Sequence, residues 1–449
     1  MLIKRPKGTQ DLIPSQIHKW KTVEGIVSQT AEQFGFKEIR TPVFEDSSLY
    51  VRSVGDTSDV VTKEMYTVSS KGDDVFTLRP EGTAGVIRAM LENGIMNEGF
   101  PQKVYYIMPF YRHEKPQAGR YREFRQFGVE MVGSSSAYAD AEIILLAASV
   151  LDSCGIDDLE LHLNSIGCPK CRKNYRDALK SYFEPHRNEL CPTCNERLDK
   201  NPMRLLDCKS PICKDIAKDA PVITDYLCID CREHFLKLQK ILDGYEIKYT
   251  IDPRIVRGLD YYTRTVFEFI SNDIGAQGTV CGGGRYDGLI GELGGQNTPA
   301  LGFGMGLERL IMTMESRGCE FEKSKTPDLY IAPMGEQAQE KAALLCDAVR
   351  RAGYAAEFDI IERGLKPQMR YADKIGAKFV CVLGDNEIDS GEAKIKNMKS
   401  GEETQVKLVD FISVFNGLLI SELFGDDLAN ELTDIVSEMP AAELPPNIT

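Results

Sequence analysis

The chain has 449 residues, of which 42% are hydrophobic and 27% charged, values typical of soluble globular proteins with several domains. Its net charge of −14 excludes a protein that coats nucleic acid with a strongly basic surface, although local basic patches can still bind RNA in a salt-dependent manner. No apolar run approaches about 18 residues and the N-terminal segment lacks a signal-peptide core, so we expect no membrane span and a cytoplasmic location.

Apolar positions at helical spacing predict a helix over residues 14–34, and a strand containing Pro42 is expected over 36–44. A second strand is expected over 74–79, followed by a turn that Pro80 and Gly82 mark. We expect Thr83 to cap a helix over 84–91, which places Glu81 and Thr83 at a strand end where a pocket can form.

Residues 104–133 read VYYIMPFYRHEKPQAGRYREFRQFGVEMVG and predict two antiparallel strands joined by a basic loop over 112–122. Arg112 follows the first strand, and its planar guanidinium is suited to bind phosphate. Gln126 and Glu130 are four positions apart on the second strand, so they lie on one face of the sheet. A phosphate-binding cation beside an anionic acceptor suggests ATP and an amino acid as ligands.

Residues 299–312 read PALGFGMGLERLIM and predict a glycine-rich strand that leads into a helix. Gly302, Gly304 and Gly306 would let a flat ligand lie close to the backbone. Arg309 is expected in the first turn of that helix.

These two stretches resemble motifs 2 and 3 of class II aminoacyl-tRNA synthetases. Two further stretches, RGLDYY at 257–262 and GGGRYD at 282–287, resemble the signatures of the histidyl-tRNA synthetase family. The resemblance extends from near residue 1 to about residue 420. It implies an α+β fold: a catalytic domain built on an antiparallel sheet, with a cysteine-rich insertion, followed by a C-terminal α/β anticodon-binding domain.

The resemblance implies that histidine is activated by ATP, with its Mg²⁺, and is then transferred to the 3′ end of tRNA(His). Arg112 would bind the α-phosphate, Arg309 the γ-phosphate or adenine side of ATP, and Arg257 both the histidine carboxylate and the α-phosphate. The family also implies a homodimer, to which the segment over 14–44 contributes.

Neutral imidazole offers one hydrogen-bond donor and one acceptor. We expect Glu130 to accept the donated proton and the Tyr262 hydroxyl to donate to the acceptor. The remaining residues that we expect to bind histidine are Glu81, Thr83, Gln126, Tyr261 and Tyr286.

The predicted domains are the catalytic domain in two parts, 1–166 and 241–322, the insertion 167–240, the anticodon-binding domain 327–424 and an acidic tail 425–449. Alternating strands and helices predict a mainly parallel sheet in the anticodon-binding domain 327–424. Lys366, Gln368 and Arg370 are its candidate anticodon contacts by their polar character near a helix start.

The insertion holds eight cysteines, at positions Cys168, Cys171, Cys191, Cys194, Cys208, Cys213, Cys228 and Cys231. Their CxxC pairs have spacings typical of zinc ribbons. Two zinc sites, one zinc site, or a small core of reduced cysteines all fit this pattern.

Three other functions fit parts of the sequence. A regulatory subunit of ATP phosphoribosyltransferase resembles the same catalytic domain but lacks the C-terminal domain. A zinc-dependent RNA-binding module would explain the cysteines but not Glu81, Arg112, Glu130 and Arg309. A different class II synthetase would explain motifs 2 and 3 but not the two histidine-type signatures.

Overall fold

The computed structural model describes residues 3–55, 58, 60–69, 75–156, 158–208, 210–256, 259–271 and 278–424. The chain forms two compact units, Met1–Glu322 and Lys323–Thr449, and each is described by itself. The predicted site residue Arg257 lies outside the described residues.

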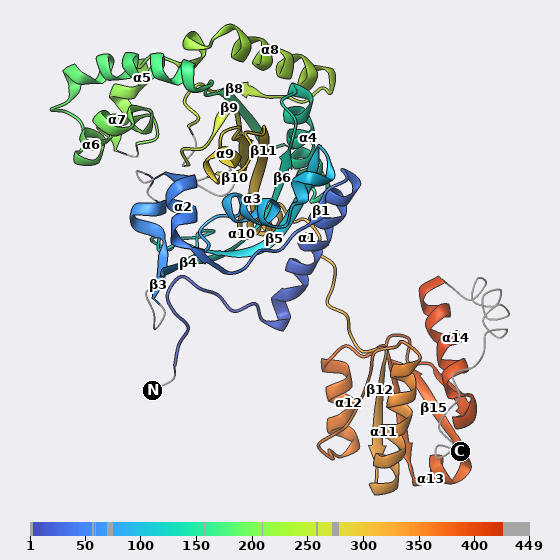
Figure 1. Cartoon of the computed structure of the whole chain (residues 1–449). Coiled ribbons are helices and arrows are strands. Elements are labelled where there is room, and N and C mark those ends of the chain that lie inside the picture. Colours follow the sequence, from blue (N-terminus) through green and yellow to red (C-terminus); the bar gives the residue numbers. More distant parts are fainter. Residues whose placement is uncertain are drawn as a thin grey trace. The chain divides into compact units, whose positions relative to one another are not determined.

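An eight-stranded sheet forms the framework of the first unit (Figure 1). In spatial order its strands are β1 (Lys37–Glu38), β5 (Gln102–Tyr111), β6 (Glu123–Val132), β11 (Ala300–Gly306), β10 (Thr279–Arg285), β9 (Thr263–Ile270), β7 (Glu160–Ser165) and β8 (Thr250–Ile251). The pairs β1–β5 and β7–β8 are parallel, and the pairs between them are antiparallel. The predicted hairpin is confirmed as β5 and β6, and the predicted glycine-rich strand is confirmed as β11.

Helices pack on both faces of this sheet. Those outside the insertion are α1 (Pro14–Gln33), α2 (Ser47–Val54), α3 (Thr83–Glu92), α4 (Ala137–Ser153), α9 (Leu289–Glu292) and α10 (Leu307–Ser316). Side chains alternate along β6, so Phe127 and Val129 enter the apolar core that α1 and α4 complete. Glu130 points to the opposite face, where α3 lies.

A small antiparallel sheet lies beside α2, with strands β2 (Phe44–Asp46), β4 (Val75–Leu78) and β3 (Tyr66–Ser69) in that order. The prediction of one strand over 36–44 is wrong, because β1 and β2 are separate strands in different sheets. Pro42 lies between them and has no backbone N–H to donate to a strand ladder, which explains the interruption.

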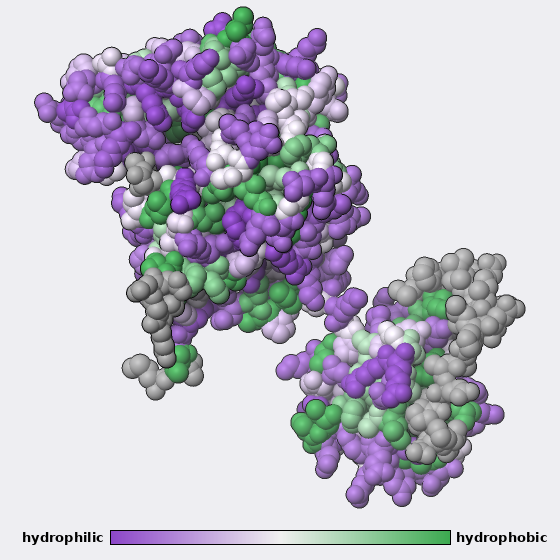
Figure 2. Space-filling model, viewed as in Figure 1, coloured by the Kyte–Doolittle hydropathy of each residue, from purple (hydrophilic) through white to green (hydrophobic). Residues whose placement is uncertain are grey.

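The insertion is a set of helices that leaves the main sheet after β7. Its helices are α5 (Pro169–Phe183), α6 (Pro192–Lys200), α7 (Pro211–Ile216) and α8 (Ile229–Gly244), and Figure 1 draws them in green at the top. Its visible surface in Figure 2 is mainly hydrophilic. The last helix returns to the sheet, since Phe235, Leu238 and Leu242 are buried in the core with α4.

The second unit is a five-stranded sheet with helices. Its elements are β12 (Leu329–Met334), α11 (Glu336–Arg351), β13 (Ala356–Phe358), α12 (Leu365–Lys374), β14 (Phe379–Gly384), α13 (Asp385–Ser390), β15 (Glu392–Asn397), β16 (Glu403–Lys407) and α14 (Phe411–Phe424). The strand order is β13-β12-β14-β15-β16. The prediction of a mainly parallel sheet is wrong, because β13, β12 and β14 are parallel whereas β15 and β16 add two antiparallel pairs.

Among the residues that the structure describes, no helix combines the length and the apolar character needed to cross a membrane.

Candidate active site

Glu130 of β6 lies at the centre of a buried polar pocket, with its side chain only 1% exposed. The Thr83 hydroxyl donates a 2.8 Å hydrogen bond to Glu130 Oε1, and the Tyr106 hydroxyl donates one of 3.3 Å to the same oxygen. The Tyr286 hydroxyl donates to Glu130 Oε2. The carboxylate thus joins β5, β6, α3 and the GGGRYD signature.

Burial of Glu130 raises the pKa of its carboxyl group to about 8. Hydrogen bonds from Tyr286, Thr83 and Tyr106 oppose this shift, while the negative charge of Glu81 adds to it. The group therefore titrates near neutral pH, and a ligand that donates a hydrogen bond or brings positive charge would favour its ionised form.

Glycines make room for the side chains of this pocket. A Cβ at Gly302 would lie 2.2 Å from Glu130 Oε2, and a Cβ at Gly128 or Gly82 would lie within 2.4 Å of the Tyr106 ring. At Gly306 such a Cβ would have no heavy atom within 4 Å among the described residues, apart from the glycine and its two neighbours in the chain. Of the three glycines predicted to face a ligand, Gly302 therefore faces the Glu130 side chain of the protein itself, whereas the space beside Gly306 is open.

Glu81 caps the N-terminus of α3. Its carboxylate accepts hydrogen bonds of 2.8 Å from Thr83 N and 3.0 Å from Ala84 N. The prediction that Thr83 caps this helix is wrong, because Thr83 is the first helical residue and its hydroxyl donates to Glu130 instead. Burial raises the pKa of Glu81, although the two backbone N–H groups and nearby Arg112 oppose the shift.

Three tyrosine rings from the two signatures pack together beside these carboxylates. The ring centroids of Tyr261 and Tyr262 are 4.8 Å apart, and those of Tyr261 and Tyr286 are 5.6 Å apart. All three tyrosines are nearly buried, and the Tyr261 hydroxyl lies 3.5 Å from Glu81 Oε2. The sequence prediction that these tyrosines share a site with Glu130 and Glu81 agrees with this arrangement.

Two predicted arginines follow strands of the same sheet, Arg112 directly after β5 and Arg309 in the helix after β11. Arg112 donates a 2.8 Å hydrogen bond from Nε to Pro80 O, and its guanidinium lies over the Phe124 ring. Arg309 on α10 donates from Nη1 to Thr279 O at 2.6 Å and from Nε to Gly119 O at 3.3 Å. Burial lowers the pKa of Arg309, and the charges of Arg120 and Arg112 lower it further. Glu114, which forms an ion pair with Arg120, opposes this shift, and a polyanion such as a triphosphate would relieve the repulsion that Arg309 experiences from both arginines.

Gln126 lies half-buried on β6, on the same face as Glu130, as the spacing predicts. The sequence analysis missed Tyr106 and Arg120. The position of Tyr106 on β5, opposite Gly128 of β6, was the signal that could have identified it.

The carboxylate of Asp140 supports the GGGRYD signature from α4. Asp140 Oδ1 and Oδ2 each accept a 3.0 Å hydrogen bond from Arg285 Nε, and both side chains are almost completely buried. His234 Nε2 of α8 lies 3.2 Å from Asp140 Oδ2. Burial opposes ionisation of Asp140, but Arg285 and His234 outweigh it and lower its pKa.

The insertion contacts the RGLDYY signature directly. Arg172 Nη1 of α5 donates a 3.0 Å hydrogen bond to Tyr262 O. Asp260 Oδ1 accepts hydrogen bonds of 3.0 Å from Arg204 Nη2 and 3.2 Å from Asn201 Nδ2. The segment that carries Tyr261 and Tyr262 is therefore held by the insertion as well as by the sheet.

The eight cysteines of the insertion form two separate sets. The first is Cys168, Cys171, Cys228 and Cys231, and the second is Cys191, Cys194, Cys208 and Cys213. Within each set all sulfur atoms lie within 4.8 Å of one another, which suits the binding of a metal ion.

Comparisons with known proteins match both units. A family model described as histidyl-tRNA synthetase matches residues 8–170 and 216–310, and one described as an anticodon binding domain matches residues 328–418.

Curated relatives match nearly the whole chain. The chain is 52% identical to a protein named histidine–tRNA ligase from Caldanaerobacter subterraneus subsp. tengcongensis, over 92% of this chain and 99% of the relative. It is 51% identical to the protein of the same name from Acetivibrio thermocellus, with the same coverage. The solved structure of apo S. aureus histidyl-tRNA synthetase is 38% identical, covers 92% of this chain and 100% of its own, and has a TM-score of 0.79.

Proposed function

Because the chain belongs to the histidyl-tRNA synthetase family, we propose that it is a histidine–tRNA ligase that uses ATP. In the first step a carboxylate oxygen of histidine attacks the α-phosphorus of ATP, and pyrophosphate leaves. In the second step a hydroxyl of the terminal ribose of tRNA(His) attacks the carbonyl carbon of the adenylate, and AMP leaves. The attacking groups belong to the substrates, so the protein supplies positioning and charge neutralisation.

One observation carries this proposal. The curated histidine–tRNA ligases match 92% of this chain and 99% of their own length, so the match includes the catalytic unit and the anticodon-binding unit together. A regulatory subunit without the second unit does not account for that match.

The proposed amino-acid site is built around Glu130. In it Glu130 accepts a hydrogen bond from the imidazole and the Tyr262 hydroxyl donates to the other ring nitrogen, with Tyr261 and Tyr286 as walls. Glu81 and Thr83 bind the α-amino group, and Gln126 lies at the rim. The support for this assignment is the convergence of two buried carboxylates and three tyrosines in one pocket, which suits an α-amino group together with a neutral imidazole.

The proposed ATP site lies at the arginines. Arg112 binds the α-phosphate and Arg309 the γ-phosphate or adenine side, and the repulsion among their guanidinium groups would be relieved by phosphate. Arg257 is proposed to hold the histidine carboxylate and the α-phosphate together. Mg²⁺ that accompanies ATP would neutralise further phosphate charge.

Several further properties are proposed from the family. The protein forms a homodimer, binds tRNA(His) and works in the cytoplasm, where translation uses its product. The proposed domains are 1–166 with 241–322 for catalysis, 167–240 for the insertion and 327–424 for the anticodon, followed by the tail 425–449. Lys366 and Arg370 are exposed on α12 and remain candidates for anticodon contact. Gln368 is withdrawn, because its fully buried side chain donates to Pro333 O and Arg363 O.

The test is exchange of labelled pyrophosphate into ATP, measured with each of the twenty standard amino acids in turn. We expect exchange with histidine alone. Exchange with a different amino acid would keep the class II chemistry and overturn the assignment of Glu130 and Tyr262. No exchange with any amino acid, from folded protein, would overturn the ligase and favour a regulatory binding protein.

A further inference from the structure

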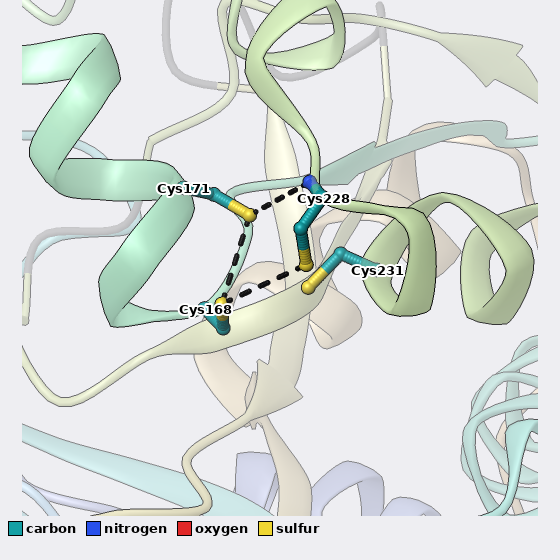
Figure 3. Close-up of side chains that lie close together, drawn as sticks. All are labelled: Cys168, Cys171, Cys228 and Cys231. Atoms are coloured by element: carbon teal, nitrogen blue, oxygen red, sulfur yellow. Dashed lines mark hydrogen bonds between the residues drawn. The ribbon is translucent and has the colours of Figure 1, made fainter.

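Each set of cysteines combines two pairs from different parts of the insertion. The first set joins the first and last CxxC pairs, and the second joins the middle CxxC pair with a CxxxxC pair. Figure 3 shows the first set, in which Cys168 and Cys171 from the start of α5 face Cys228 and Cys231 from the start of α8. Cys168 and Cys228 are 60 positions apart, at the two ends of the insertion. The second set, Cys191 with Cys194 and Cys208 with Cys213, lies within the insertion.

The spacing of the sulfur atoms fits one tetrahedral ion in each set. With a zinc–sulfur bond of about 2.3 Å, the sulfurs of a tetrahedral site are about 3.8 Å apart. In the first set the Sγ atoms of Cys168 and Cys171 are 3.6 Å apart, and those of Cys168 and Cys228 are 4.0 Å apart. In the second set the Sγ atoms of Cys191 and Cys208 are 3.8 Å apart. A disulfide requires about 2.05 Å, and all eight cysteines are free.

Backbone N–H groups point at the sulfurs of both sets. Cys228 N donates to Cys171 Sγ at 3.1 Å in the first set, and Cys191 N donates to Cys213 Sγ at 3.3 Å in the second. Ser210 N adds a bond of 3.4 Å to Cys208 Sγ. Such N–H groups support the negative charge that metal-bound thiolates carry.

Three of the pairs lie at helix N-termini. Cys168, Cys191 and Cys228 are the residues that precede α5, α6 and α8, and their CxxC partners lie in the first turns. The positive end of a helix dipole favours thiolate over thiol. Zn²⁺ is bound by cysteine thiolates, so the N-terminal helix ends suit its binding.

The geometry points to two structural Zn²⁺ ions, one in each set of four cysteines, of which the first also positions the histidine-binding segment 260–264. The insertion needs such support because it is a small group of short helices, and small folds commonly depend on metals or disulfides. The family model leaves residues 171–215 unmatched. That stretch contains five of the eight cysteines, so the family model gives no information about them.

The first site is linked to segment 260–264 through its neighbours in sequence. Arg172, next to Cys171, donates to Tyr262 O at 3.0 Å. Gly167, next to Cys168, accepts a 3.0 Å hydrogen bond from Arg264 N, and Ile166 N donates to Arg264 O at 2.7 Å. A Cβ at Gly167 would lie 2.5 Å from Cys171 Cβ, so the chain is tightly packed at this point. An ion that fixes Cys168 and Cys171 therefore fixes the backbone on which Tyr262 stands.

The first experiment measures metal by mass spectrometry in the full-length, untagged, reduced protein. We expect two zinc ions per chain. We expect Cys171→Ser and Cys213→Ser each to lose one ion, while the control Cys319→Ser, outside both sets, keeps two. Wild-type protein with less than about half an equivalent, or with iron in place of zinc, overturns the zinc assignment. One zinc ion per chain in the wild type overturns the two-site assignment. These wild-type measurements decide the matter even where the serine variants fail to fold.

The second experiment tests the positioning role, which rests on the proposed function. Arg172→Ala should keep two zinc ions and raise the KM for histidine in pyrophosphate exchange about tenfold, because Tyr262 loses its support, while the KM for ATP stays within about twofold. Equal rises in both KM values, or no rise, would overturn the positioning role. Absence of exchange by the wild type would instead overturn the ligase and leave the metal count untouched.

Discussion

The sheet pocket and the insertion hold their functional segments by different means. Around Glu130 the polar groups satisfy one another through hydrogen bonds, on strands whose other face is packed in an apolar core. In the insertion an apolar core is accompanied by two sets of four closely spaced sulfur atoms. The pocket is thus organised by the fold, whereas we expect the insertion to be organised by what it binds.

This difference teaches where each region is vulnerable. A buried polar network is costly to break in part, because a partner left behind remains desolvated. A metal site fails when its ion is lost, and the damage then reaches the pocket through the hydrogen bonds at Tyr262, Asp260 and Arg264 and through the apolar core that the two regions share. Four predictions test this difference, from the largest expected change in free energy to the smallest.

The largest effect is expected from Asp140→Asn. Arg285 would lose its fully buried partner and keep the longer contact of 3.3 Å with the partly exposed Asp287 Oδ1, and breaking a buried ion pair costs about 3–5 kcal/mol. We expect the free energy of unfolding of the first unit to fall by that amount in urea denaturation followed by hydrogen exchange of β10. The control is Asp347→Asn on α11, which removes an exposed partner of Arg351. An effect below about 1 kcal/mol, the range of surface pairs, would show that the pair does not organise the sheet.

The second effect is expected from Arg112→Gln, which removes the proposed α-phosphate ligand but keeps hydrogen-bonding capacity. Loss of one charge-stabilising donor typically costs about 100- to 1000-fold in kcat. We expect that loss in histidine-dependent pyrophosphate exchange with the fold unchanged. Arg351→Gln, on the exposed surface of the second unit, should leave exchange unaltered. A loss of less than about tenfold for Arg112→Gln would move the phosphate site elsewhere.

The sequence predicted the sheet pocket well because its signals are local. An apolar run over 104–110 and the alternation over 124–132 predict two strands, and the four-residue spacing of Gln126 and Glu130 predicts a shared face. The glycine-rich pattern of 299–306 and the apolar spacing after it likewise predicted the strand β11 and the helix α10.

Prediction from the sequence failed where residues distant in the chain determine the contacts of a side chain. Nothing local shows that Glu81 rather than Thr83 caps α3, since that choice depends on Glu130 across the pocket, which the Thr83 hydroxyl reaches. The sequence suggests that Gln368 is an exposed polar residue near a helix start. Its side chain is buried instead and donates hydrogen bonds to the carbonyls of Pro333 and Arg363. The pairing of the cysteines also depends on how α5 and α8 meet, which CxxC spacing alone leaves open.

The third effect is expected from Glu130→Gln. If Glu130 accepts a hydrogen bond from the imidazole, loss of its charge should weaken histidine binding by about 1.5–3 kcal/mol, or roughly 10- to 100-fold. We expect the KM for histidine to rise by that factor while the KM for ATP changes less than about twofold. The control Glu92→Gln, exposed at the end of α3, should change neither value. Equal rises for both substrates would remove Glu130 from the imidazole site.

The smallest effect is a pH dependence of stability that arises from the buried carboxyl group of the pocket. The pKa of Glu130 rises from about 4.5 to about 8 on folding because the carboxyl group is buried. Between these values the folded state holds a proton that the unfolded state has released, so the free energy of unfolding falls as pH rises through this window.

Glu130→Gln removes the titrating group, and the fall in unfolding free energy between about pH 5 and 8 should therefore become shallower than in the wild type. Urea midpoints of the first unit at each pH unit measure this slope. Glu184→Gln in the insertion removes an exposed partner of Arg187 and should leave the slope unchanged. Some slope will remain in Glu130→Gln, because burial also raises the pKa of Glu308 to about 7. A slope identical to that of the wild type would mean that Glu130 is ionised throughout, as a carboxylate held by its three hydroxyl donors.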